Sequence, residues 1–305
     1  MLNLALPFHG CVFSKLKKTM SDRISQCISC GGTNFKYYAE NKTLKVPIYI
    51  CQNCKLHVAG ESQKQLDDIL KKFYENDFWD MERNEGLDDS HNDTYSVGRK
   101  RLFLSQIKYV KKFLTENSKI LEIGSGHGET LIELEKLNFQ TTGVEPDLQN
   151  VKHLRKTLKK SKIIQSTIEN LTIDEKFDFI WMSHVFEHLS DPISFLNNIK
   201  KNMNKTYFLF IEVPSVTKKN DYRKFTVVPH AYNYSGIALQ NVLKKTGYKI
   251  ISCDYFGPPT KLNGGMNKIS TKFFKKNYYP FYPKMLLDAD TGEDIRVIAQ
   301  YSGMS

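Results

Sequence analysis

The stretch Ile120-Leu-Glu-Ile-Gly-Ser-Gly-His-Gly128 decides the fold of this chain. It begins as a short apolar strand and runs directly into a turn with three glycines, after which Glu129–Leu137 has the apolar spacing of a helix. Glycines in such a turn let the backbone come close to a ligand, because they lack a side chain and accept a positive φ. A strand, a glycine turn and a helix in this order predict a nucleotide-binding turn.

Strand and helix patterns alternate from this turn to the end of the chain. Strands are expected at Lys119–Ile123, Gln140–Val144, Lys162–Gln165, Phe177–Met182, Tyr207–Val213, Lys249–Cys253 and Ile295–Tyr301. Helices are expected at 99–115, Glu129–Leu137, 148–160, Asp191–Met203 and Ser235–Thr246. This alternation predicts a doubly wound, seven-stranded α/β sheet whose ligand lies at the carboxyl ends of the strands.

The spacing of the glycine turn and the acidic residues around it indicate the kind of ligand. Glu145 ends the next strand, where a carboxylate accepts hydrogen bonds from ribose hydroxyls. A dinucleotide-binding domain would use Gly-x-Gly-x-x-Gly, with a pyrophosphate at the helix N-terminus. Here the spacing is Glu122-x-Gly124-x-Gly126-x-Gly128, and Glu122 would repel a phosphate but bind an amino group.

Three motifs carry a resemblance over residues 95–305: Leu121-Glu-Ile-Gly-Ser-Gly-His-Gly128, Gly143-Val-Glu-Pro-Asp147 and Phe177-Asp-Phe-Ile-Trp-Met-Ser-His-Val-Phe-Glu-His-Leu-Ser-Asp-Pro192. In these motifs the chain resembles the class I S-adenosylmethionine-dependent methyltransferases. The resemblance implies S-adenosylmethionine as cofactor, with the glycines against its methionine and ribose parts. The implied cofactor-binding residues are Glu122, Gly124, Ser125, Gly126, Gly128, Glu145, Pro146, Thr167, Ile168 and Ser183. Many relatives carry an Asp near the adenine, where this chain has Ser166, so adenine recognition would rest on the backbone there.

Four residues after the fourth expected strand are candidates for catalysis. Methyl transfer is an in-line displacement, in which the enzyme aligns the reactants and supplies a base if the nucleophile is a hydroxyl. His184 is the first candidate for this base, because a neutral imidazole accepts a proton near pH 7. The alternative is that His184 only orients the cofactor or caps the following turn. Ser183, Glu187 and His188 lie beside it, and the last two are more often structural in this family.

A metal-dependent mechanism is a second interpretation of the same stretch. His184-x-x-Glu187-His188 resembles the Glu-x-x-Glu-His metal motif of ubiquinone-pathway O-methyltransferases and of small-RNA 2′-O-methyltransferases. The latter add a distant histidine, a role that His230 would take here. A divalent catalytic metal would polarise an acceptor hydroxyl. This chain departs from the motif in having His184 in place of the first Glu.

The cysteine pairs Cys27-x-x-Cys30 and Cys51-x-x-Cys54 predict a structural zinc site. Zinc prefers four tetrahedral thiolates, and a two-residue gap lets one tight turn present two sulfurs to the same ion. The β-like stretch Leu44–Ile50 between the pairs completes the layout of a zinc ribbon. A redox role is the alternative, but neither pair begins a helix in a thioredoxin-like pattern. The metal would supply folding energy on the order of 10 kcal/mol.

These signals divide the 305 residues into parts. We expect a tail at 1–22, a zinc ribbon at 23–60 and a linker with an aromatic cap segment at 61–98. The methyltransferase domain follows at 99–305, with a substrate-side insertion at 254–294.

Charge and cysteine use bear on partners and location. The net charge of +11 favours acidic partners such as phosphorylated molecules or nucleic acid, although the lysines are spread along the chain. Paired cysteines with metal-ligand spacing indicate a reducing compartment, so we expect a cytoplasmic protein. No apolar run reaches the roughly 18–20 residues that a membrane span needs.

The acceptor is the part of the function that the sequence specifies least. Lys218–Tyr234 and the insertion interleave aromatic and basic residues that would stack on sugars or bases, or would form an aromatic flap on the sheet. A zinc ribbon joined to this catalytic type resembles bacterial methyltransferases of sugar, polysaccharide and natural-product pathways. We therefore expect O-methylation of a saccharide, a nucleotide-linked sugar or a related small molecule. The alternatives are an RNA methyltransferase acting on ribose 2′-O or a base, a deoxysugar C-methyltransferase, and an inactive zinc-ribbon binding protein.

Overall fold

The computed structural model describes residues 22–76, 93–168, 170–216, 222–257, 285–287 and 292–303. The predicted tail, apart from Asp22, lies outside the described residues. So do residues 77–92 of the predicted cap segment, residues 217–221 and most of the predicted insertion.

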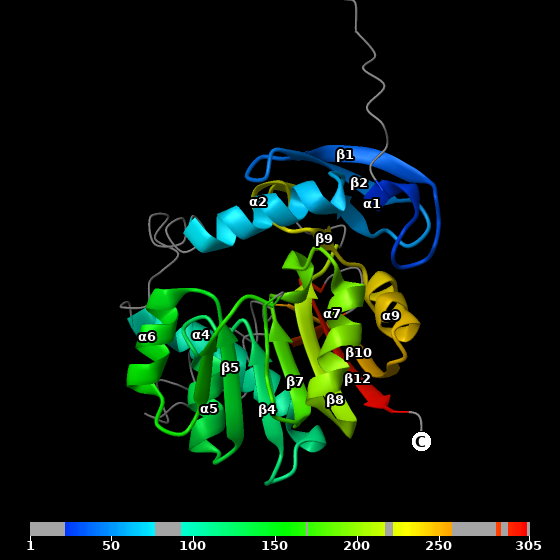
Figure 1. The fold of residues 1–305 in the computed structure, drawn as a ribbon. Coiled ribbons are helices and arrows are strands. Elements are labelled where there is room, and N and C mark those ends of the chain that lie inside the picture. Colours follow the sequence, from blue (N-terminus) through cyan, green and yellow to red (C-terminus); the bar gives the residue numbers. More distant parts are fainter. Residues whose placement is uncertain are drawn as a thin grey trace, which may run out of the picture.

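The main sheet has eight strands in the order β11-β10-β12-β8-β7-β4-β5-β6 (Figure 1). Their bounds are β4 Lys119–Ile123, β5 Gln140–Glu145, β6 Lys162–Gln165, β7 Phe177–Ser183, β8 Met203–Pro214, β10 Lys249–Gly257, β11 Met285–Leu287 and β12 Asp294–Ser302. Strands β6, β5, β4, β7 and β8 are parallel, and β12 runs antiparallel between β8 and β10. The seven predicted strands are all present, which confirms the predicted α/β sheet. Strand β11 is an additional short strand at one edge.

Three of the described helices begin at a capping side chain, namely Asp147, Asp191 or Ser235, while the helix predicted at 99–115 begins earlier, at Asp93. The helices of this part are α4 Asp93–Val110, α5 Glu129–Lys136, α6 Leu148–Thr157, α7 Pro192–Ile199, α8 Tyr222–Val227 and α9 Gly236–Lys245, with 3-10 turns at Lys111–Phe113, Phe186–His188 and Lys200–Asn202. The Asp191 side chain accepts a hydrogen bond from the Ser194 amide at 3.0 Å, as its position before Pro192 predicts. None of the described helices is long and apolar enough to cross a membrane.

Alternate side chains of the central strands build two separate cores. Phe179 and Trp181 of β7 point to the face covered by α4 and α5. Ile180 and Met182 point to the opposite face, which α7 and α9 cover. Successive strand residues face opposite sides of a sheet, so β7 has to be apolar on both faces to sit in the middle. This sandwich holds the carboxyl ends of the strands at one rigid edge.

The N-terminal module is a second, four-stranded sheet in the order β1-β2-β3-β9. It consists of α1 Asp22–Ser25, β1 Phe35–Asn41, β2 Val46–Cys51 and β3 His57–Ala59, followed by helix α2 Gln63–Asn76. Its last strand, β9 Tyr232–Asn233, comes from the catalytic part of the chain. The module lies over the edge of the main sheet where its parallel strands end, with α2 between them (Figure 1). Its apolar side chains belong to the same core as α7 and α9, so the two parts are packed as one unit.

Candidate functional site

The glycine turn between β4 and α5 has the backbone that its sequence predicts. Gly124, Gly126 and Gly128 have φ values of 73°, 51° and 81°, in the left-handed region that favours glycine. A side chain at Gly124 would collide with Val185, so the turn also packs closely against the loop after β7. The Gly126 amide donates to Glu145 Oε2 at 2.8 Å, which ties this turn to the end of β5.

Glu122 is a buried carboxyl group at the base of this turn. Burial raises its pKa to about 8. Its Oε2 has no hydrogen-bond partner among the described residues. An unpartnered buried carboxylate is costly, and an ammonium group placed beside it would relieve that cost. The geometry therefore fits the amino group that the sequence assigns to Glu122.

Glu145 and the segments next to it form the neighbouring part of the edge. Both Glu145 oxygens accept backbone amides, one from Gly126 and one from Asp147 at 3.0 Å. Each carboxylate oxygen has a further lone pair, which leaves acceptor capacity for ribose hydroxyls. Burial raises the pKa of Glu145 to about 7. Pro146 follows directly, and Thr167 and Ile168 follow β6, the next strand in the sheet.

A groove of about 340 Å³ begins at Ile168. Its lining mixes polar residues with apolar ones such as Leu171, Leu189 and Phe195, and helix α2 of the N-terminal module contributes Gln63. The groove therefore extends from the predicted adenine end of the site to the N-terminal module. The candidate catalytic residues do not line it.

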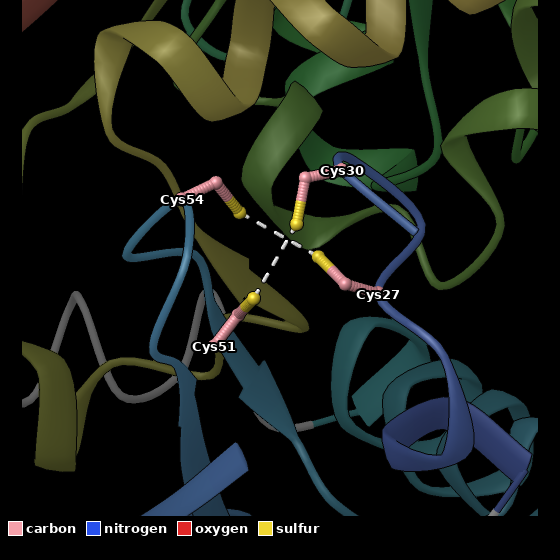
Figure 2. A group of neighbouring side chains, drawn as sticks. All are labelled: Cys27, Cys30, Cys51 and Cys54. Atoms are coloured by element: carbon pink, nitrogen blue, oxygen red, sulfur yellow. Dashed lines mark hydrogen bonds between the residues drawn. The ribbon is translucent and has the colours of Figure 1, made fainter. Parts of the chain in front are cut away.

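The four cysteines of the N-terminal module converge on one point (Figure 2). Their sulfur atoms all lie within 4.8 Å of one another, with Cys27 Sγ 3.6 Å from Cys54 Sγ and Cys30 Sγ 3.5 Å from Cys51 Sγ. A tetrahedral zinc ion with sulfurs at about 2.3 Å separates those sulfurs by about 3.8 Å. The cluster therefore fits a zinc ion, as the spacing predicts.

Each cysteine pair sits on its own tight turn. The Gly31 amide donates to the Cys27 carbonyl and the Lys55 amide to the Cys51 carbonyl, both at 2.9 Å. Gly31 and Lys55 both have a positive φ, of 73° and 61°. The two turns are thus alike, although only the first has glycine where the backbone is left-handed.

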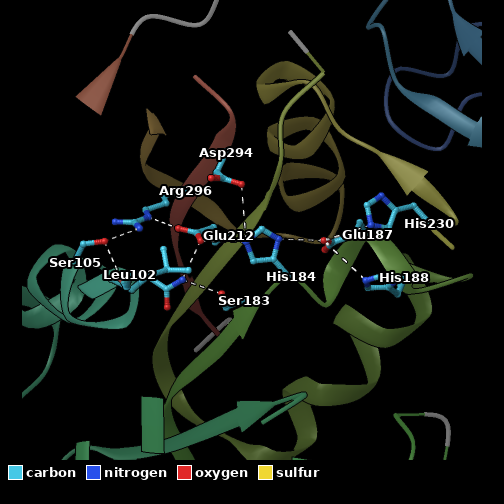
Figure 3. Close-up of polar contacts among 11 residues, drawn as sticks. Leu102, Ser105, Ser183, His184, Glu187, His188, Glu212, His230, Asp294 and Arg296 are labelled. Atoms are coloured by element: carbon cyan, nitrogen blue, oxygen red, sulfur yellow. Dashed lines mark hydrogen bonds and ion pairs between the residues drawn. The ribbon is translucent and has the colours of Figure 1, made fainter. Parts of the chain in front are cut away.

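His184 lies at the end of β7 among three carboxylates (Figure 3). Its Nδ1 is 3.5 Å from Glu187 Oε1, and its Nε2 is 3.3 Å from Glu212 Oε1 and 3.8 Å from Asp294 Oδ1. Its backbone is left-handed, with a φ of 54°, which is rare outside glycine and often marks a functional site. The side chain is 38% exposed, whereas those of Glu187 and Glu212 are buried, so His184 is the member that faces solvent.

Behind His184 lies a buried polar network that carries no solvent-exposed charge. Arg296 forms an ion pair with Glu212, and both side chains are fully buried. Gln106 of α4 donates to Glu212 Oε1 at 2.9 Å and to Ser183 Oγ at 2.8 Å. The hydroxyl of Ser183, which the sequence assigns to the cofactor site, thus accepts a hydrogen bond from the protein itself.

Glu187, His188 and His230 form a second compact group, which we call the imidazole–carboxylate cluster. One ligand-type atom from each lies within 4.8 Å of the other two, and both histidine Nε2 atoms are 4.0 Å from Glu187 Oε1. His188 Nδ1 donates to the Pro229 carbonyl at 3.2 Å, and His230 Nδ1 donates to Asn233 Oδ1 at 2.6 Å. Because each Nδ1 carries the proton, each Nε2 presents a lone pair to the carboxylate.

The charge state of this cluster follows from its burial. Burial lowers the pKa of His188, and it lowers the pKa of His230 to about 4, so both imidazoles are neutral at pH 7. In the described part of the chain, neither oxygen of Glu187 has a hydrogen-bond partner. Two imidazole lone pairs and a carboxylate thus face one another, an arrangement that binds a cation or accepts a proton in passing. Burial acts to raise the pKa of Glu187, but the surrounding histidines lower it overall, so the cluster does not hold a proton at pH 7.

The structure places the predicted residues His184, Glu187, His188 and His230 near one another, and it adds supporting residues that the sequence did not indicate. The missed residues are Gln106, Glu212, Asn233, Asp294 and Arg296. Glu212 left a signal, since it is a charged residue near the end of the apolar run 207–213. The others left none, because α4, β12 and the segment before α9 reach the site only through the packing of the whole fold.

Comparison with known proteins identifies the family. Residues 91–253, more than half of the chain, match a family described as a methyltransferase domain. The chain belongs to this methyltransferase domain family. It has the fold of the S-adenosylmethionine-dependent methyltransferases.

Solved structures agree with the methyltransferase fold. The plantazolicin methyltransferase BpumL, in complex with a monoazolic desmethylPZN analog and SAH, gives a TM-score of 0.50 at 15% identity, covering 79% of this chain and 98% of that one. A chain from the complex between the Haloferax volcanii Trm112 methyltransferase activator and a methyltransferase gives a TM-score of 0.51 at 13% identity, covering 74% and 97%. At these identities the likeness concerns the fold alone.

Curated relatives of the methyltransferase act on different acceptors. A ubiquinone biosynthesis O-methyltransferase from Rickettsia akari is 27% identical over 105 residues, which are 33% of this chain and 42% of that protein. A tRNA U34 carboxymethyltransferase from Campylobacter jejuni is 25% identical over 156 residues, 46% of this chain and 53% of that protein. The chain spans about half the length of these relatives, so their acceptors do not transfer to it directly.

Proposed function

We propose that this methyltransferase transfers the methyl group of S-adenosylmethionine to a hydroxyl oxygen of a saccharide, a nucleotide-linked sugar or a related small molecule. The imidazole–carboxylate cluster carries this proposal. Methylating a hydroxyl breaks the S–CH₃ bond, forms an O–CH₃ bond and releases the hydroxyl proton, which has to be accepted. An amine with a free lone pair needs no such acceptor, so a buried group of proton acceptors favours an oxygen nucleophile.

The proton of the acceptor hydroxyl would pass from the exposed side of the site, where the hydroxyl binds, to the buried cluster. His184 is the solvent-facing residue, and its Nδ1 lies 3.5 Å from Glu187 Oε1. We assign His184 to orienting the hydroxyl, and Glu187 with the neutral imidazoles of His188 and His230 to taking up the proton. His184 can act as the base itself only when Nδ1 or Nε2 is released from its carboxylate neighbour.

The same three residues fit a divalent cation. Their donor set is one carboxylate oxygen and two Nε2 lone pairs, with each Nδ1 proton fixed by a carbonyl oxygen, as is usual for metal-ligating histidines. Such a cation, when bound, would polarise the acceptor hydroxyl. One carboxylate oxygen and two imidazole nitrogens favour zinc or iron over magnesium. His184, which stands where the resembling metal motif has a glutamate, lies outside this donor set.

Electrostatics at the reaction centre support a small acceptor over a nucleic acid. Glu187, Glu212 and Asp294 surround His184, and closely spaced carboxylates repel a phosphate placed next to the reacting hydroxyl, as in RNA; the phosphates of a nucleotide-linked sugar can lie farther away. RNA is the second candidate, since the chain carries a net charge of +11 and one relative is a tRNA-modifying enzyme. A polyanion would then bind through the lysines outside the centre.

Transfer of labelled methyl groups distinguishes these acceptors. The full chain is incubated with methyl-tritiated S-adenosylmethionine and either a set of nucleotide-linked sugars and oligosaccharides or total RNA. Label in an acid-stable, base-stable sugar ether supports O-methylation of a saccharide. Label in RNA replaces the proposal by the second candidate, and a methyl on carbon replaces it by C-methylation. Cofactor binding without transfer to either set contradicts both acceptor classes.

A further inference from the structure

The N-terminal module forms several hydrogen bonds with the segment that carries His230. At one end, the turn after β1 holds it: Asn41 Nδ2 donates to the Val228 carbonyl at 2.7 Å, and the Lys42 amide donates to the Thr226 carbonyl at 2.6 Å. These contacts join residues that are more than 180 positions apart in the sequence. The segment before His230 is thus fixed by the module on one side, and on the other by His188, whose Nδ1 donates to the Pro229 carbonyl.

On the other side of His230 the segment becomes part of the module. The Ala59 amide donates to the Ala231 carbonyl at 3.0 Å, and β9 pairs with β3 through Tyr232 with Val58 and Asn233 with His57. Tyr232 is buried, and its ring lies under the Arg23 guanidinium at 4.6 Å. The backbone of Asn233 is therefore paired with β3 of the module, while the next residue, Tyr234, is bridged to Ser215 just after β8.

The last contact of the segment reaches the cysteine cluster itself. Ser235 Oγ donates to the carbonyl of Cys54 at 2.6 Å and accepts the Ala238 amide at 3.1 Å as the cap of α9. Cys54, a predicted zinc ligand, is therefore hydrogen-bonded to Ser235, five positions after His230. Between them, Asn233 holds the His230 imidazole from its Nδ1 side.

We propose that Asn233 is a positioning residue for His230, and that the zinc-ribbon module supplies the support that keeps Asn233 in place. Asn233 Oδ1 accepts the Nδ1 proton of His230, so the Nε2 lone pair points at Glu187. Without this acceptor the proton can move to Nε2 and donate to Glu187, and the cluster loses one of its proton acceptors. The module is then part of the catalytic apparatus through β9, not an independent appendage.

The expected loss of activity rests on the proposed function, in which the imidazole–carboxylate cluster takes up a proton. The tautomer of His230 does not depend on that function. The first experiment therefore reads the tautomer directly. Nitrogen-15 spectra of the imidazoles distinguish a protonated Nδ1 from a protonated Nε2, and comparison with His230→Gln assigns the His230 signals. In the zinc-loaded full chain we expect the Nδ1–H form.

Three variants test the role of Asn233. Asn233→Leu keeps the volume but removes the acceptor; we expect a mixed His230 tautomer and a roughly 10- to 100-fold loss of kcat with unchanged cofactor affinity. Asn233→Asp keeps the acceptor, and we expect it to keep the Nδ1–H form and most of the activity. Asn197→Ala, an exposed asparagine on α7, is the matched control and should behave like the parent protein.

A second experiment tests the link to the zinc-ribbon module. We expect Cys51→Ser to accelerate hydrogen exchange of the amides of residues 231–234 roughly tenfold or more, and to mix the His230 tautomers, while the amides of β4 stay protected. Cys253→Ser, a cysteine on β10 outside the cluster, is the control. Unchanged exchange at 231–234 in zinc-free Cys51→Ser overturns the supporting role of the module.

The outcomes separate this inference from the proposed function. A pure Nδ1–H tautomer in Asn233→Leu overturns the positioning role of Asn233, whatever the activity. A mixed tautomer with undiminished kcat supports the positioning role but contradicts the role of His230 in catalysis. If Asn233→Leu does not bind the cofactor, Asn233→Asp decides: an Nε2–H form there overturns the inference as well.

Discussion

The cysteine cluster and the imidazole–carboxylate cluster both gather ligand-type side chains within 4.8 Å, but they are built in different ways. Each cysteine pair lies on one tight turn whose own backbone hydrogen bonds aim the two sulfurs. The imidazole–carboxylate cluster takes two residues from the 3-10 turn after β7 and the third from a segment some 40 residues later in the chain. The first is therefore a local structure, and the second is a product of the whole fold.

This difference affects how far each part of the chain depends on the other. A zinc ion would fix the two local turns of the zinc-ribbon module directly, although the module also takes β9 and a shared core from the part that forms the main sheet. His230, in turn, is positioned in part by strands and turns of that module. Substitution of a cysteine should therefore disturb the imidazole–carboxylate cluster, whereas substitution within that cluster should leave the zinc site intact.

The largest effect is expected from Cys27→Ser. A four-cysteine zinc site contributes folding energy on the order of 10 kcal/mol, and a hydroxyl is a poor replacement for a buried thiolate ligand. We expect the bound zinc, measured by atomic emission, to fall from one per chain to near zero. The thermal midpoint should fall with it. Cys253→Ser is the control and should retain both.

Retention of full zinc and stability by Cys27→Ser would contradict the structural site and would leave the redox interpretation of the cysteines. Retention of stability after zinc loss would contradict a different point, namely that the metal stabilises the module. It would mean that the shared core of the module and helices α7 and α9 suffices without metal.

The next effect concerns the buried support of His184. Arg296→Met leaves Glu212 as a buried carboxylate without its guanidinium partner, which typically costs 3–5 kcal/mol. We expect chemical denaturation to show a loss of about this size. The double variant Arg296→Met with Glu212→Leu should lose less, because it removes the uncompensated charge as well. Arg155→Met, at an exposed position on α6, is the matched control, and an equal loss there would refute the argument.

The third effect isolates the chemistry of the imidazole–carboxylate cluster. Glu187→Gln keeps the shape of the side chain but removes the negative charge that the two Nε2 atoms face. We expect kcat to fall roughly 10²- to 10⁴-fold, the usual range for loss of a general acid or base, with cofactor affinity unchanged. The matched control is Glu175→Gln, whose partly exposed side chain pairs with Lys162 at the surface. Activity close to that of the parent protein in Glu187→Gln would leave this cluster with a structural role only.

Local signals in the sequence predicted most of the fold and half of the site. The seven expected strands, the cap at Asp191 and the glycine turn depend on neighbouring residues, so periodicity and spacing were sufficient. The edge strand β11, the strand β9 that joins the zinc-ribbon module and the contacts of Arg296 depend on residues that meet only after folding. His184, Glu187 and His188 were found because they lie together in sequence, and Asn233 was not because its role depends on β3.

The smallest effect is expected at Glu122. This buried carboxyl group is a single residue, in contrast to the cysteine cluster and the imidazole–carboxylate cluster. Burial raises its pKa to about 8, so at pH 6 it is protonated and has to lose that proton to bind an ammonium group. We expect the affinity for S-adenosylmethionine, measured by calorimetry, to rise between pH 6 and pH 8, by at most about tenfold per pH unit. The stability of the cofactor-free protein should change in the opposite direction. An acid whose folded pKa lies above its unfolded value of 4.5 favours unfolding increasingly as the pH rises from 4.5 towards 8.

Glu122→Gln separates these two trends from other titrations of the site. The amide cannot ionise, so the variant should bind the cofactor more weakly at pH 8, by roughly tenfold, because a hydrogen bond to a charged group is lost. Its affinity should then vary less with pH than that of the parent protein, and its cofactor-free form should be the more stable of the two at pH 8. A pH dependence of binding that persists unchanged in Glu122→Gln would assign the titration to another group, with Glu145 the first to test, since burial raises its pKa to about 7.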